Sequence, residues 1–87
     1  METIVTSSGF TAETDVSRVD DMLFLETIRR IQHGDLIAYI DAAEMILGEE
    51  GKNRLYEHVK TAEGHVPTAA FNSELTEIVS GLRSKKK

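Results

Sequence analysis

The stretch from Gly34 to Gly64, GDLIAYIDAAEMILGEEGKNRLYEHVKTAEG, decides the fold of this chain. Glycines stand at its two ends and at position 48, and the segments between them carry apolar residues at helical spacing. The pattern predicts two short helices, at about 35–47 and 49–62, separated at Gly48. Apolar residues nearly encircle the first of these helices, so we expect it to be the most buried element.

Each of these two helices is expected to turn one side toward the core. The inner side of the helix at 35–47 is predicted to hold Leu36, Tyr39, Ile40, Ala43 and Leu47, widened by Ile37 and Ile46. The inner side of the helix at 49–62 is predicted to hold Leu55 and Val59, flanked by Tyr56.

The flanking segments predict two further helices. One covers about 15–33, capped by Asp15 or Ser17, and the other runs from Pro67 or Thr68 to about 82. The first has a broad apolar face formed by Val19, Met22, Leu23, Leu25, Ile28 and Ile31, with Phe24 off that stripe. The last has an inward stripe formed by Phe71, Leu75, Ile78 and Leu82.

Residues 1–14 have a different pattern. The β-branched run at 3–6, the turn residues at 7–9 and the following segment to Thr14 predict a β-hairpin or an extended arm. The predicted fold is therefore mainly α: a small bundle of about four short helices at 15–82, with an N-terminal extended arm or β-hairpin at 1–14. We expect residues 83–87 to form a disordered basic tail.

Composition limits the classes of function. The chain has 87 residues, which predicts one domain, and it has no cysteine and therefore no disulfide framework. The N-terminus lacks the apolar run of a secretory signal, and no segment has the length of apolar sequence needed to span a membrane. All fifteen acidic residues but only six of the ten basic residues lie in residues 1–82, so this body has a net charge of −9. We expect a cytoplasmic protein that binds neither nucleic acid nor membranes.

No motif predicts catalysis. His33, His58 and His65 lack the i, i+4 spacing of a helical metal site, and the Gly48–Gly51 segment lacks the Lys and Ser or Thr of a phosphate loop. Adjacent acidic pairs on a helix point in different directions and cannot work as an acid and base pair. We expect no enzyme activity, no cofactor and no metal site.

The order of several short motifs resembles a known family. These motifs are Ser7–Phe10, Asp20–Met22, Phe24–Glu26, Gly34–Asp35, Leu47–Glu50, Leu55–Val59, Glu63–Pro67 and Glu77–Val79. Together they resemble the small tail assembly chaperones of long-tailed bacteriophages, over about residues 7–80. Each motif alone is weak, and the resemblance depends on their order and spacing.

The resemblance implies a binding role and no catalytic site. Members of this family bind the tape measure protein, keep it soluble, recruit tail tube subunits and are absent from the mature virion. They work in the host cytoplasm, and a ribosomal frameshift gives a longer form. The resemblance assigns no binding residue in this sequence.

We therefore expect binding through apolar side chains that lie off the inward stripes. The candidate residues for binding a protein partner are Phe24, Ile37, Met45 and Tyr56. Ordinary core packing or scattered surface exposure also explains each of them. The sequence leaves open an acidic inhibitor that mimics DNA, a virion structural protein, and a homo-oligomer of this chain.

Overall fold

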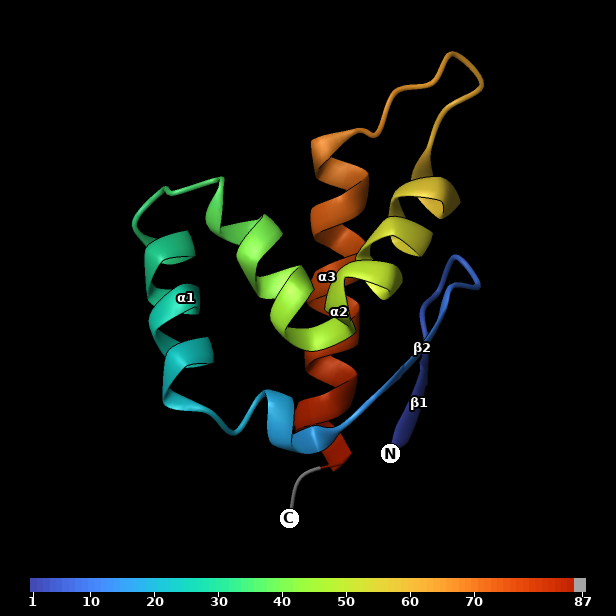
Figure 1. Cartoon of the computed structure of the whole chain (residues 1–87). Coiled ribbons are helices and arrows are strands. Elements are labelled where there is room, and N and C mark those ends of the chain that lie inside the picture. The colour runs from blue at the N-terminus through green and yellow to red at the C-terminus, as the bar shows by residue number, and fades with distance from the viewer. Residues whose placement is uncertain (86–87) are drawn as a thin grey trace.

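The computed structural model describes residues 1–85 as a hairpin followed by helices (Figure 1). The elements are β1 (Glu2–Val5), β2 (Thr11–Thr14), the 3-10 helix η1 (Val16–Arg18), α1 (Met22–Gln32), α2 (Ala38–Val59) and α3 (Thr68–Lys85). α2 contacts α1, α3 and β2, and α3 also contacts β1 and η1. In Figure 1, α1 and the hairpin lie on opposite sides of the α2–α3 pair. A mainly helical protein with an N-terminal hairpin is confirmed.

The number of helices differs from the prediction, because residues 1–85 contain three α-helices rather than about four. The two helices predicted at 35–47 and 49–62 are one element, α2, which bends at Gly48. Gly48 has φ 74° and ψ 171°, a backbone conformation that favours glycine because it has no Cβ. The glycine therefore kinks the helix and changes its direction without ending it.

The first helix begins later than predicted. Asp15 does act as a cap, because its side chain accepts a hydrogen bond from the Ser17 backbone N–H at 3.0 Å, but it caps only η1. Asp21 has an extended backbone and accepts a hydrogen bond from the Leu23 N–H at 2.7 Å. Helical geometry is thus interrupted before Asp21, and α1 begins one residue later.

The hairpin packs on the helices through alternate residues. β1 and β2 are antiparallel, and Ile4 lies opposite Ala12 with both side chains buried. Ile4 also lies against Gly81 of α3, where an added Cβ would be 2.9 Å from the Ile4 Cγ2. The missing side chain at Gly81 lets β1 approach the helix closely, which gives this two-stranded hairpin the support that an isolated one lacks.

The inward stripe predicted for the last helix is confirmed. Phe71, Leu75, Ile78 and Leu82 are all buried, and they join one core cluster. The other buried members of that cluster come from the hairpin and its turn, the segment after η1, α1 and α2. They are Ile4, Phe10, Ala12, Val19, Phe24, Ala42, Ala43, Ile46 and Leu55.

The predicted inner faces of α1 and of the first half of α2 are partly wrong. In α1 the buried side chains are Phe24 and Thr27, while Met22, Leu23 and Leu25 are exposed. In α2 the buried face runs through Ala38, Ala42, Ala43 and Ile46, while Leu36, Ile37 and Ile40 are exposed. Both segments carry apolar residues on two sides. In α2 the small alanines let neighbouring elements approach closely, so the alanine side packs inward.

The prediction of a disordered tail at 83–87 does not hold for its first three residues, because α3 continues through Arg83, Ser84 and Lys85. Lys85 lies 3.8 Å from a carboxylate oxygen of Glu2, which brings the two ends of the described chain together. Lys86 and Lys87 lie outside the described residues.

Candidate functional site

An apolar groove opens where the start of α2 meets the start of α3. It has a volume of about 470 Å³ and is lined by Leu36, Ile37, Tyr39, Ile40, Tyr56, Val66, Thr68, Phe71 and Asn72. We call this surface the apolar groove. Its lining combines residues from both halves of kinked α2 with residues before and within α3, so the bend at Gly48 helps to form it.

The rim of the apolar groove is unusually exposed for large apolar side chains. Leu36 is 64% exposed, Ile37 66% and Ile40 38%. Single exposed apolar residues are normal on a protein surface, but neighbouring ones in a hollow are typical of a binding surface.

The aromatic side chains of the groove are held in place by their neighbours. The Tyr56 and Phe71 rings lie with centroids 5.2 Å apart, tilted by 43°. Lys52 Nζ lies 5.6 Å from the Tyr56 ring centroid and pairs with Glu44 at 2.6 Å. The hydrogen bond to Glu44 raises the pKa of Lys52 above its usual value, opposed by desolvation. This side of the groove is therefore already ordered before any partner binds.

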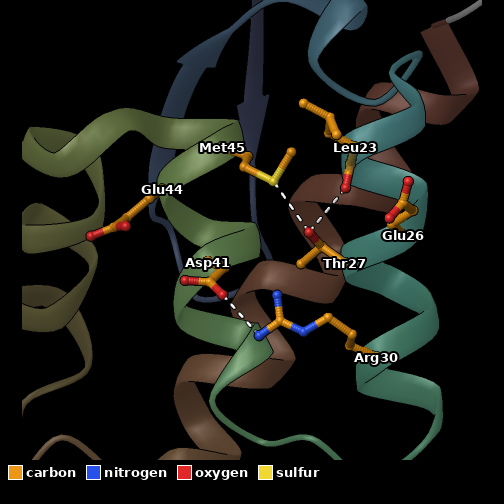
Figure 2. A pocket seen from close by; sticks show the side chains of 7 residues that line it. All are labelled: Leu23, Glu26, Thr27, Arg30, Asp41, Glu44 and Met45. Carbon is orange, nitrogen blue, oxygen red and sulfur yellow. Dashed lines mark hydrogen bonds and ion pairs between the residues drawn. The ribbon is translucent and has the colours of Figure 1, made fainter.

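A second groove lies between α1 and α2, and Figure 2 shows its lining. It has a volume of about 530 Å³, and its lining residues are Leu23, Glu26, Thr27, Arg30, Asp41, Glu44 and Met45. We call it the acidic groove. Arg30 reaches across it to Asp41 at 3.0 Å and also pairs with Asp35 at 3.1 Å. The hydrogen bonds to Asp41 and then Asp35 raise the pKa of Arg30.

The four residues predicted to bind a partner fall into three places. Ile37 and Tyr56 meet in the apolar groove, and Met45 lines the acidic groove. Phe24 is fully buried in the core, so the expectation that it lies on a surface is wrong. The reason is that the side of α1 facing the core is the one with Phe24 and Thr27, and not the predicted side with Met22, Leu23 and Leu25.

Sequence reasoning missed Leu36 and Ile40 as surface residues, because it placed them on the inner side of their helix. The signal that identifies the true inner side is the spacing of Ala38, Ala42 and Ile46 at steps of four, with Ala43 beside them. Small residues at this spacing indicate a face packed closely against another element.

A polar cluster that the sequence did not predict fastens the hairpin turn to the helices. The buried carboxylate of Glu74 accepts hydrogen bonds from Thr6 Oγ1 at 2.6 Å and from Ser8 Oγ at 2.8 Å. Ser8 Oγ also lies 2.9 Å from His58 Nε2. In a nucleophilic triad the histidine stands between the serine and the acid. Here Ser8 stands between His58 and Glu74 and donates its proton to Glu74, which is not the order of a catalytic triad. The cluster instead attaches the hairpin turn to the helices.

No group of three or more His, Asp or Glu side chains in residues 1–85 is arranged to hold a metal ion. Within the same residues, no helix combines the length and apolar character needed to cross a membrane.

Comparison of the chain with protein-family models, curated proteins and solved structures gave no match. The resemblance to tail assembly chaperones therefore depends on the motifs in the sequence alone.

Proposed function

We propose that this chain is a bacteriophage tail assembly chaperone that binds the tape measure protein and keeps it soluble. It also helps to recruit tail tube subunits, acts in the host cytoplasm and is absent from the mature virion. The observation that carries this proposal is the apolar groove, with Leu36, Ile37 and Ile40 exposed along its rim. The order of the sequence motifs directs it to this family and to this partner.

The groove has the physical properties of a surface for an apolar helix. A partner that lays an amphipathic helix into a hydrophobic groove gains free energy from the anchors that it covers. Fully burying one large aliphatic side chain contributes about 1.5–3 kcal/mol, so three exposed anchors offer several kcal/mol before the entropy lost on binding. The net charge of −5 favours solubility, because like-charged molecules of the chain or of its complexes repel one another.

The test is co-expression with a bacteriophage tape measure protein, followed by pull-down and a solubility assay. We expect the partner to co-purify and to stay soluble with the wild-type chain. The double variant Ile37→Gln/Ile40→Gln should lose binding, because glutamine keeps the size of the side chain but adds a polar group that favours water. Val5→Gln is the control, since Val5 is 65% exposed, as Ile37 is at 66%, but lies on β1, outside both grooves.

Salt separates this proposal from its alternatives. Capture of an apolar helix should largely survive high salt, whereas the complex of an acidic DNA mimic should dissociate. Recovery of this chain from purified virions would instead support a virion structural protein. Precipitation of the partner with and without the chain would refute the chaperone function.

A further inference from the structure

The outward face of α2 changes from apolar to acidic within two helical turns. Three residues lie three, four and seven positions after Ile37, namely Ile40, Asp41 and Glu44. At these spacings all four side chains share one face of the helix. A rise of about 1.5 Å per residue places Glu44 about 10 Å along the axis from Ile37. This face joins the apolar groove on one side to the acidic groove on the other.

The floor of the acidic groove offers apolar surface in spite of its polar residue. Thr27 Oγ1 donates to the Leu23 carbonyl oxygen at 3.0 Å and lies 3.4 Å from Met45 Sδ (Figure 2). The hydroxyl is therefore already satisfied within the protein. Leu23 is 66% exposed, and Met45 has a flexible, polarizable side chain that adapts to a partner.

The walls of the acidic groove are negatively charged. Three lining residues are carboxylates, Glu26, Asp41 and Glu44, against the single guanidinium of Arg30. Asp41 pairs with Arg30, and Glu44 pairs with Lys52. In Figure 2, Glu26 extends from α1, and Glu44 extends from α2 on the side away from α1.

This charge selects the chemistry of the occupant. A neutral apolar helix laid over both grooves would remove water from Glu26, which has no ion pair among the described residues, without giving it a partner, and this is unfavourable. A nucleic acid or an anionic membrane would be repelled. A helix with cationic side chains at this level replaces the lost water with ion pairs. The exposed pair between Arg30 and Asp41 stabilises the fold only weakly, so an incoming cation displaces Arg30 from Asp41 with little loss. The Lys52 side chain is only 11% exposed, so Lys52 keeps its pair with Glu44.

We propose that the segment bound by this chain is an amphipathic helix with two parts. Its apolar residues fill the apolar groove, and its Lys or Arg side chains, about two turns further along, lie against Glu26, Asp41 and Glu44. The inference rests on the proposed function for the identity of the partner, and it adds the surface, the register and the charge of the bound helix.

The test uses the full chain and two synthetic peptides of about 18 residues, or five helical turns. Both share one leucine stripe, and they differ at three positions two turns along, which are lysine in one peptide and glutamine in the other. Binding is measured by fluorescence anisotropy at low and high salt. We expect the lysine peptide to bind at least about fivefold more tightly at low salt, with the difference shrinking at high salt.

Matched variants locate this preference. Glu26→Gln/Glu44→Gln should abolish the advantage of the lysine peptide, and Glu13→Gln/Glu63→Gln should retain it, since both control residues are exposed and lie outside the two grooves. Equal binding of the two peptides, no binding of either, or equal losses in both double variants would overturn the inference.

The same variants distinguish the inference from the proposed function. If the peptides bind equally while the tape measure protein is still retained through Ile37 and Ile40, the inference fails and the proposed function stands. If the tape measure protein is not retained but the lysine preference persists and depends on Glu26 and Glu44, the proposed function fails and the assigned surface stands.

Discussion

Replacing Phe24 with alanine should severely destabilise this protein, whereas the same change at Leu23, the preceding residue, should not. Phe24 is 0% exposed and lies within the core cluster, while Leu23 is 66% exposed. The two positions point in different directions because successive residues are about 100° apart around a helix. The two substitutions therefore test which side of α1 faces the core, which the sequence predicted wrongly.

The expected magnitudes differ widely. Phe→Ala at a buried site costs about 3–5 kcal/mol, from lost burial and from the cavity left behind. A change at an exposed position usually lies within about 0.5 kcal/mol of zero. Domains have about 0.05–0.15 kcal/mol of stability per residue, or about 4–13 kcal/mol for this chain. Phe24→Ala should therefore remove about a quarter of the stability or more.

Urea unfolding followed by helical circular dichroism measures both variants, with the midpoint reporting stability and the slope reporting the surface exposed. If Phe24→Ala does not fold, Phe24→Leu supplies the measurement, with an expected loss below about 1.5 kcal/mol that still exceeds the loss for Leu23→Ala. If Leu23→Ala lowers the free energy of unfolding more than Phe24→Ala does, the assignment of Phe24 to the inner side of α1 is wrong. Loss of partner binding by Phe24→Ala with unchanged stability would restore the surface role predicted from the sequence.

Three further changes test other parts of the fold. Gly81→Ala should lower the free energy of unfolding by about 1 kcal/mol, because crowding against the stiff side chain of Ile4 outweighs the gain in helix propensity; urea unfolding measures it. Glu74→Ala should cost about 2 kcal/mol and speed amide exchange in the hairpin, because the buried Thr6 hydroxyl loses its acceptor. The pKa of Asp15 lies below its usual value of 3.8 because a backbone N–H donates to it. Its charge therefore stabilises the fold above pH 3.8, and the stability difference from Asp15→Asn should vanish as the pH falls below that value.

Each of these predictions has a control on the same element or in the same measurement. Ser80→Ala, at an exposed position of α3, should raise stability slightly, and a similar gain for Gly81→Ala would contradict the close approach of β1. Within residues 1–85, the Glu77 carboxylate accepts only from the exposed Ser7 N–H, so Glu77→Ala should cost less than Glu74→Ala. If the difference in stability between the wild type and Asp15→Asn grows as the pH falls, the pKa of Asp15 is raised in the folded protein and the prediction is wrong.

The parts of the fold that the sequence predicted correctly have strong local signals. The stripe from Phe71 to Leu82 has only one apolar side, so its inner face is unambiguous. The turn residues at 7–9 between two β-branched or extended segments predicted a β-hairpin or an extended arm, and the structure has the hairpin. Gly48 was recognised as a break in the helix, although the chain continues as a helix on both sides of it.

The candidate site was predicted less well than the fold. Of the four proposed residues, Ile37 and Tyr56 lie together in the apolar groove, whereas Phe24 lies in the core. An exposed apolar residue and a buried one have the same side chain, so an amphipathic pattern with two apolar sides does not identify the inner side. The binding role of Ile37, Met45 and Tyr56 stays a prediction.

The sequence by itself determined the helical class, the extended character of the N-terminal segment, the acidic body and the positions where glycine changes the path of the chain. These depend on local properties, namely backbone conformations, spacing of apolar residues and charge. Only the tertiary structure decided which side of α1 and α2 faces inward, because that choice depends on how closely other elements approach. The close packing of Ala38, Ala42 and Ala43 turned Leu36, Ile37 and Ile40 outward, and in doing so created the groove that we propose binds the partner.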